Sequence, residues 1–190
     1  MADHLPAPTS TSTLTAEPLP MPLAAVRLTA YTPADLVEIL GDAPDPFGVD
    51  DAGLTWLPKE VHFGVRAEGR LVAHAGLLRV PVSIGGTEAE VIGVGGVAVA
   101  ADLRGRGLAR TVLTAALDHA RTLGPRHALL FCRPPLVALY ERLGWRTLEQ
   151  DIRVEQAGGP VVMPLRTMRT PLVDGAEWPP GEVRLLSFPM

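Results

Sequence analysis

The chain has little of several residue types, and each scarcity excludes a class of protein. Cys132 is the only cysteine among 190 residues, so no intrachain disulfide can form and no oxidising compartment is needed. Because Cys132 ends an apolar run, we interpret it as a buried thiol rather than as a nucleophile. Lys59 is the only lysine, and it is followed by glutamate, which excludes a P-loop.

Long apolar runs and an excess of positive charge are also missing. No run approaches the ~18 residues that span a membrane, and the first residues lack the basic and apolar regions of a signal peptide. We therefore expect a cytoplasmic protein without a membrane partner. The net charge of −4 argues against nucleic acid as a main partner and is compatible with a cationic amine. The histidines show no metal-ligand spacing, so no metal is predicted.

The length of the chain predicts one domain with a full core. Residues 1–22 are rich in Pro, Ser and Thr without periodicity, which predicts a disordered tail before a single domain over 23–190. Apolar alternation predicts a first strand over 24–30, and Thr32-Pro33 predicts the start of a helix ending near residue 40. Residues 41–58 carry several aspartates among Pro and Gly, which predicts a loop.

The remaining pattern indicates a mixed sheet. Three strands separated by short turns form an antiparallel meander, and a helix, a buried strand, a second helix and another strand follow it. Such an order predicts helices on both faces of the sheet. The expected strands lie at 61–67, 71–84, 88–100, 126–132 and 145–150, and the expected helices at 106–123 and 134–143.

The turn that enters the helix at residue 106 has the chemistry of an anion site. A helix N-terminus presents unpaired N–H groups and the positive end of the helix dipole. Gly105 and Gly107 allow close approach of a phosphate, and Arg104 and Arg106 add charged donors. An isolated turn of this kind is also compatible with a solvated helix cap. The glycines at 93–96 match a dinucleotide fingerprint weakly, because they lie inside an apolar run.

Two motifs carry a resemblance to a known family. Residues 104–109 resemble the Arg/Gln-x-x-Gly-x-Gly/Ala signature of the GNAT N-acetyltransferase superfamily, and residues 139–145 are similar to its Leu-Tyr-x-x-x-Gly-Phe/Trp element. The resemblance implies an α/β (α+β) fold, in which an antiparallel meander precedes a β-α-β-α-β acetyl-CoA-binding unit. It also implies an acetyl-CoA-dependent enzyme that acetylates a primary amine of a small molecule.

The resemblance assigns roles to particular residues. Backbone groups of Val97, Ala98 and Val99 would pair with the pantetheine arm of coenzyme A, and Tyr140 would protonate the departing thiolate. A phenol with an ordinary pKa of about 10 is a suitable proton donor at neutral pH. Tyr140 also lies on an apolar helix face, so a core aromatic is the alternative. The residues expected to hold the pyrophosphate are Arg104, Gly105, Arg106, Gly107, Leu108 and Ala109, and Arg133 stands where many members have an asparagine that bonds the cofactor.

A narrower resemblance concerns the acceptor. Residues 178–184 are similar to the closing Trp-x-x-Gly-Asp-Val segment of the aminoglycoside 2′-N-acetyltransferases, which implies that Glu182 contacts amino groups of an antibiotic and that the protein is a homodimer. Gly95 stands where that subgroup has a glutamate beside the reacting amine, and Gly96 follows it in the same strand. Asp50 and Asp51 are further amine-binding candidates, because their segment forms a wall of the acceptor site in the family.

Several alternatives stay open. The acceptor could be another amine, such as an amino acid, a polyamine, a biosynthetic intermediate or a protein N-terminus. The protein could instead be a non-catalytic acyl-CoA-binding protein, or a nucleotide-binding module that uses residues 104–107. Glu182, Asp50 or a water chain are the candidate bases, and His74 is less suited because a lone strand histidine is more often a packed residue.

Overall fold

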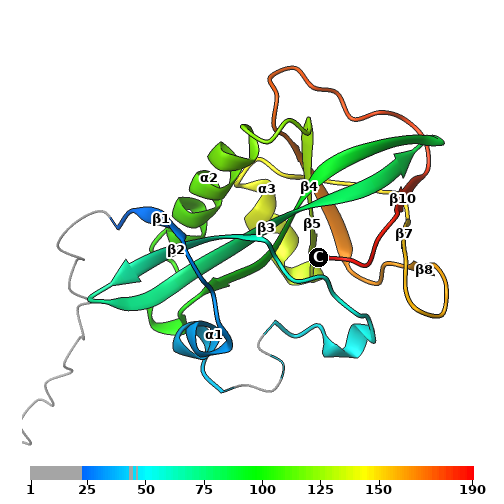
Figure 1. The fold of residues 1–190 in the computed structure, drawn as a ribbon. Coiled ribbons are helices and arrows are strands. Elements are labelled where there is room, and N and C mark those ends of the chain that lie inside the picture. The colour runs from blue at the N-terminus through cyan, green and yellow to red at the C-terminus, as the bar shows by residue number, and fades with distance from the viewer. Residues whose placement is uncertain (1–22, 43–44, 46) are drawn as a thin grey trace, which may run out of the picture.

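The computed structural model describes residues 23–42, 45 and 47–190, so the tail expected over 1–22 lies outside the described residues. Within them, ten strands form one sheet that is flanked by three α-helices (Figure 1). The strands are β1 (Ala25–Leu28), β2 (Val61–Ala67), β3 (Arg70–Ile84), β4 (Thr87–Val99), β5 (His127–Cys132), β6 (Arg146–Thr147), β7 (Ile152–Val154), β8 (Val161–Val162), β9 (Arg166–Pro171) and β10 (Val183–Leu185). The helices are α1 (Pro33–Leu40), α2 (Leu108–Ala120) and α3 (Val137–Glu141), with 3-10 turns η1 (Asp50–Ala52), η2 (Ala101–Leu103) and η3 (Pro134–Leu136).

The long antiparallel meander β2–β3–β4 is the centre of the sheet. Two-residue turns close both of its hairpins, and all four turn residues have positive φ: Glu68 (50°), Gly69 (84°), Gly85 (57°) and Gly86 (83°). Positive φ at both central positions matches the twist of paired strands, which is why these turns fix the register. The expected strand bounds agree with the structure to within a few residues.

Helices cover both faces of the meander. Side chains alternate between the two faces along each strand, so each face presents apolar side chains to a helix. Phe63 of β2 packs against His119 of α2 on one face, with ring centroids 5.6 Å apart. On the opposite face His74 of β3 stacks against Tyr31, which lies just before α1, at 3.7 Å. A capping box between Thr32 and Asp35 fixes the start of α1.

The second half of the sheet differs from the expected order. β5 runs parallel to β4, as expected for a β-α-β unit, but β9 pairs with β5 along its whole length and separates it from β6. β6 therefore pairs with β9 and is two residues long, shorter than the expected strand over 145–150. β10 extends the sheet by pairing with the far end of β3, next to the turn at Gly85.

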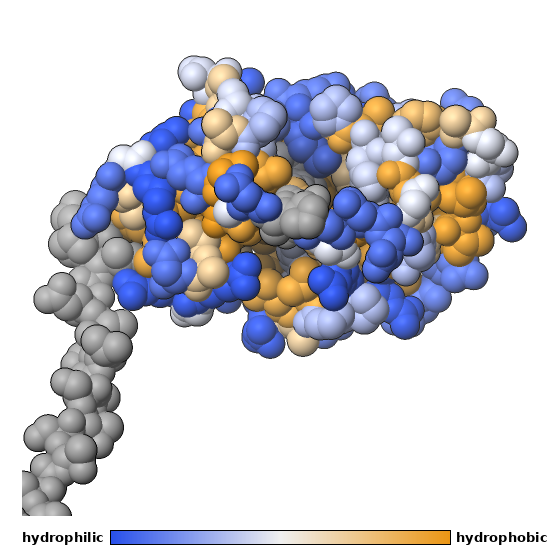
Figure 2. All heavy atoms as spheres, turned by 90° about the horizontal axis from the view of Figure 1, so that it is seen from below, coloured by the Kyte–Doolittle hydropathy of each residue, from blue (hydrophilic) through white to orange (hydrophobic). Residues whose placement is uncertain are grey.

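The helices differ from the expected ones in length. α2 begins at Leu108 rather than at residue 106, because its N-cap Gly107 has a left-handed conformation that an α-helix cannot include. No α-helix in the described part of the chain is long and apolar enough to cross a membrane. On the face in Figure 2, hydrophobic residues form separate patches among polar ones rather than a continuous band.

Candidate active site

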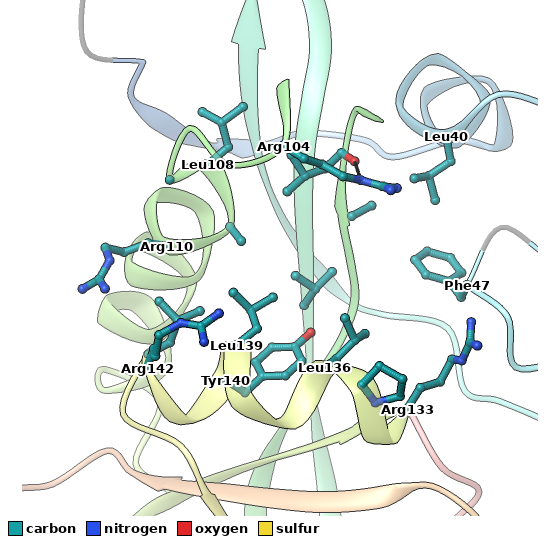
Figure 3. A pocket seen from close by; sticks show the side chains of 18 residues that line it. Leu40, Phe47, Arg104, Leu108, Arg110, Arg133, Leu136, Leu139, Tyr140 and Arg142 are labelled. Atoms are coloured by element: carbon teal, nitrogen blue, oxygen red, sulfur yellow. Dashed lines mark hydrogen bonds between the residues drawn. The ribbon is translucent and has the colours of Figure 1, made fainter. Parts of the chain in front are cut away.

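One cavity of about 680 Å³ lies where β4 leaves the sheet and faces α2 and α3 (Figure 3). Leu40 of α1 and Phe47 of the following loop close its other side. The other lining residues are Val97, Ala98, Val99, Arg104, Gly105, Gly107, Leu108, Ala109, Arg110, Arg133, Pro135, Leu136, Leu139, Tyr140, Arg142 and Leu143. The structure thus brings together nearly all residues predicted for cofactor binding and catalysis, and Arg106 is the one that is not among the lining residues.

The cavity exists because two neighbouring strands part. β4 pairs with β5 only from Ile92 to Val94. Beyond that point Gly96 and Val97 of β4 lie opposite the single residue Ala75 of β3, which is a β-bulge. Gly96 has φ of +60°, a conformation that favours glycine. β3 pairs with one edge of Val97–Val99, and β5 no longer pairs with the other edge after Val94. Among the described residues, that second edge therefore has no partner strand.

A glycine turn brings the N-terminus of α2 to this cavity. Gly105 and Gly107 have φ of 79° and 81°, and Gly107 caps α2 without any side-chain hydrogen bond. A Cβ at either position would meet no atom within 4 Å, so the glycines are needed for the backbone conformation rather than for space. The first N–H groups of the helix therefore remain available to an anion.

The electrostatic character of the cavity is positive. Arg104, Arg110, Arg133 and Arg142 line it, and the described lining residues include neither an acid nor a histidine. Arg104 is held back towards the strand, because its Nε donates to the carbonyl of Val99 at 3.3 Å. Four guanidinium groups around one cavity suit a ligand with several phosphates.

The hydroxyl of Tyr140 points into the cavity between the end of β4 and α3 (Figure 3). The ring itself is buried, with 6% of the residue exposed, and packs edge-on against Trp145 at 6.3 Å. Burial, and to a lesser degree Cys132, raises the pKa of the Tyr140 phenol well above its usual range. The phenol therefore keeps its proton at neutral pH. Tyr140 is thus a packed aromatic whose protonated hydroxyl faces the cavity.

A pair of histidines lies under the bulge on the α1 face. His74 Nδ1 is 2.7 Å from the carbonyl oxygen of Gly96, and His74 Nε2 is 3.0 Å from Nδ1 of His62 in β2. A carbonyl can only accept, so His74 donates at Nδ1 and, when neutral, accepts at Nε2 from His62. The His62 ring also forms a hydrogen bond with the backbone of Lys59, which partly offsets the effect of burial on its pKa. Burial lowers the pKa of His74 to about 4, and it also lowers that of His62.

The residues predicted for the acceptor do not meet at the cavity. Asp50 and Asp51 lie in η1 and are exposed, and neither lines the cavity. Glu182 lies at the opposite end of the β3–β4 hairpin, where its carbonyl accepts from the N–H of Gly85 at 2.9 Å. Its carboxylate is exposed and 3.9 Å from the Arg153 guanidinium. Ten residues of β4 separate that end from Val97, which corresponds to roughly 33 Å of strand.

Gly95 and Gly96 directly precede the lining residue Val97 but do not themselves line the cavity, and the side chain of Lys59 crosses Gly95. Sequence reasoning did not single out Lys59, which lies against Gly95, or His62, which lies against His74. The only signals were that Lys59 is the sole lysine and that His62 and His74 lie in neighbouring expected strands.

Two other expectations concern chemistry away from the cavity. Cys132 is 4% exposed and its thiol lies 3.7 Å from the sulfur of Met168. Burial raises the pKa of Cys132 to about 11, so the thiol is not ionised at neutral pH. Among the described residues, no group of three His, Cys, Asp or Glu side chains is arranged to hold a metal ion.

Residues 55–148 match a family model described as an acetyltransferase (GNAT) domain. Among solved structures, the chain is similar to the GNAT family N-acetyltransferase YhbS from Escherichia coli in complex with CoA, with 21% identity, a TM-score of 0.55, and coverage of 90% of this chain and 93% of that one. It is also similar to an IAA acetyltransferase from Bacillus cereus, with 17% identity, a TM-score of 0.53, and coverage of 78% and 99%.

A third similar structure is N-acetylglutamate synthase from Neisseria gonorrhoeae complexed with coenzyme A and N-acetyl-glutamate. It shows 13% identity and a TM-score of 0.53, and the match covers 78% of this chain and 35% of that one. A comparison with curated proteins found no match. The predicted fold is confirmed by these similarities, and they give no evidence for the narrower likeness to aminoglycoside 2′-N-acetyltransferases.

Proposed function

Because residues 55–148 match an acetyltransferase (GNAT) domain, we propose that the chain is a GNAT acetyltransferase, that its cavity binds acetyl-CoA and that it transfers the acetyl group to a primary amine of a small molecule. One observation carries the proposal. A strand edge without a partner strand, an N-terminus of α2 without a side-chain cap and the hydroxyl of Tyr140 all face the same cavity.

The binding roles follow from this arrangement. Apart from the Val99 carbonyl, which accepts from Arg104, the backbone groups at the outer edge of Val97–Val99 suit the amides of a pantetheine arm, much as they would suit another strand. The turn from Arg104 to Gly107 and the first N–H groups of α2 suit the pyrophosphate. Arg110, Arg133 and Arg142 add positive charge around the same cavity.

Acetyl-CoA supplies the thioester whose carbonyl carbon the amine attacks. The protein holds the two reactants together, which lowers the barrier by up to ~7 to 11 kcal/mol in favourable cases. As the new C–N bond forms and the C–S bond breaks, Tyr140 donates its phenolic proton to sulfur. The amine nitrogen loses one proton in the same turnover, so the phenol can be restored and the products are an N-acetylated amine and free CoA. No covalent enzyme intermediate is needed.

The proton that leaves nitrogen needs a base from outside the described cavity lining, which has neither acid nor histidine. Glu182 and Asp50, the bases considered from the sequence, lie away from the cavity. His62 is better placed, because its partner His74 is bonded to the carbonyl of the bulge at Gly96. We propose that His62 takes the proton through water and that His74 orients it.

The acceptor is better sought among amines other than aminoglycosides. The subgroup glutamate is replaced by Gly95, and a Cβ there would lie 2.5 Å from Cε of Lys59, so this place is filled by a lysine stem. Glu182, the other expected contact, lies at the far end of the hairpin. The expected homodimer stays a prediction, which measurement of the native mass tests.

The experiment that tests this function is CoA release from acetyl-CoA, followed with a thiol-reactive dye against a panel of amines. The panel contains amino acids, polyamines, and aminoglycosides with and without a 2′-amine. Saturable CoA release with at least one amine supports the proposal. Stabilisation by CoA in a thermal-shift assay without release for any amine would instead support a non-catalytic binder, and equal stabilisation by ATP would support a nucleotide-binding module.

A further inference from the structure

Lys59 lies in a groove that two glycines make for it. Gly76 of β3 and Gly95 of β4 are register partners on the α1 face, and the side chain of Lys59 crosses both of them. A Cβ at Gly76 would lie 2.5 Å from Cγ of Lys59, and a Cβ at Gly95 would lie 2.5 Å from Cε and 3.2 Å from Nζ. Any side chain at either position would displace the lysine, so the groove and its occupant belong together.

The ammonium of Lys59 lacks an acidic partner. Its one hydrogen bond within the described chain goes to the carbonyl of Leu57, at 3.1 Å. No Asp or Glu carboxylate of the described residues comes within 4.0 Å of it, and no ion pair joins it to Met190, the last residue, whose carboxyl carbon would lie 3.1 Å from a Cβ at Gly95. Burial lowers the pKa of Lys59 to about 8, and no neighbouring acid opposes this. A partly buried cation with two free donors is costly unless an anion joins it.

The position of this cation relates it to the proposed chemistry. Pairing between β4 and β5 ends at Val94, and Gly95 is the next residue, where the two strands begin to part. Val97, two residues further, already lines the cavity. Two residues of strand span about 7 Å, so Nζ lies within the length of a small molecule from the cavity wall.

From this geometry we propose that Lys59 binds the carboxylate of the acceptor, so that the acceptor is an amino acid or a close relative carrying both an amine and a carboxylate. The inference rests on the proposed acetyl transfer and names the class of its acceptor. Two donors of the ammonium form charge-assisted hydrogen bonds to the carboxylate. A polycationic acceptor is repelled, because the cation of Lys59 lies against Gly95, the position at which the aminoglycoside subgroup has a negatively charged glutamate.

The test compares each amino acid with its own C-terminal amide, which keeps the amine and the side chain but loses the negative charge. The twenty standard amino acids and their amides are the probes, and CoA release and thermal shift are both recorded. For the wild-type protein we expect at least one amino acid to be acetylated with a kcat/KM at least tenfold above that of its amide. An amide that is used as well as the acid, or a polyamine that is preferred over every acid, would overturn the proposal.

Two variants assign the effect to the lysine. Lys59→Met keeps the apolar stem and should raise KM for the amino acid by about 10- to 100-fold, the range for a lost charge-assisted hydrogen bond. KM for acetyl-CoA and for the amide should stay within about twofold, as long as the hydrogen bond alone is lost. Lys59→Arg should recover part of the loss. The matched control is Arg121→Met, which removes a cation from an exposed pair with Asp118.

The outcomes separate the two proposals. A rise of KM for acid and amide alike in Lys59→Met would show a structural role only and would overturn the carboxylate site. If no probe releases CoA, the proposed function fails, and the site is then judged by binding. An amino acid that stabilises the wild type but not Lys59→Met supports the site even then, and stabilisation by none of the acids overturns it.

Discussion

Removal of the Tyr140 hydroxyl tests the proposed proton transfer most directly. In Tyr140→Phe the ring keeps its packing against Trp145, because only the oxygen that points into the cavity is lost. No side chain of the described residues forms a hydrogen bond with that oxygen, so the fold should be unaffected. The variant therefore isolates the chemistry of one proton.

The size of the effect follows from the leaving group. A thiol has an ordinary pKa of about 8.5, so a thiolate can depart without a proton, though less readily. General acid catalysis contributes about 10²- to 10⁴-fold, and the lower part of that range applies to such a leaving group. We expect kcat to fall by about 10²- to 10³-fold, equal to roughly 3 to 4 kcal/mol of barrier. The Kd for CoA should stay within about twofold.

The assay is steady-state CoA release, with CoA affinity measured separately by calorimetry. Tyr31→Phe is the matched control, because Tyr31 is the other tyrosine of the chain and its buried hydroxyl has no partner among the described residues. Since burial raises the pKa of Tyr140, the wild-type kcat should show no loss from this group as pH rises to about 10. An unchanged kcat in Tyr140→Phe would refute the role of the phenol as proton donor.

Three further predictions concern the turn, the histidines and the thiol. Gly107→Ala and Gly86→Ala both place a side chain at positive φ in open space, so both should lose about 1 to 2 kcal/mol of stability. Only Gly107→Ala should also raise the Kd for CoA, by about 5- to 30-fold. Equal Kd values in the two variants would argue against the turn as the phosphate site. His74 binds its proton more readily in the unfolded than in the folded state, so the free energy of unfolding should fall by on the order of 3 kcal/mol as pH drops from about 6.5 to about 4. Urea titrations across this range measure the fall, which should be smaller in His74→Gln. A wild-type stability that does not change with pH would contradict the burial of a neutral His74. Cys132 should resist iodoacetamide at pH 8 until the protein is unfolded, and rapid labelling in the native state, detected by mass spectrometry, would contradict its burial.

The sequence predicted those parts of the molecule that local chemistry determines. The meander was predictable because turn glycines bound long apolar runs, and Gly85-Gly86 can form only a tight hairpin. The role of the turn was predicted from its resemblance to a family signature, because two glycines between a strand and a helix are also compatible with a solvated helix cap. α3 was harder to bound, since Pro134 and Pro135 replace its first turn with a 3-10 turn.

Contacts between distant segments were not predictable. The insertion of β9 between β5 and β6 depends on pairing between strands separated by more than thirty residues. The same limit misplaced Glu182 as an acceptor contact, because a sequence shows that a strand follows but not at which end of a hairpin it docks. Lys59 was missed for a related reason: its groove is formed by Gly76 and Gly95, which meet only through the register of β3 and β4.

The connectivity of the sheet has a consequence for the order of folding. β2, β3 and β4 are joined by two-residue turns, so their pairing closes almost no loop, whereas β10 must find β3 across about a hundred residues of chain. Local pairing forms faster than distant pairing. The bulge at Gly96 and the groove of Lys59 therefore belong to the part of the molecule that forms first. The strands after β6 assemble on a hairpin that already carries the unpaired edge of Val97–Val99. Changes in the length of these later strands can therefore alter the rim of the site without disturbing β4.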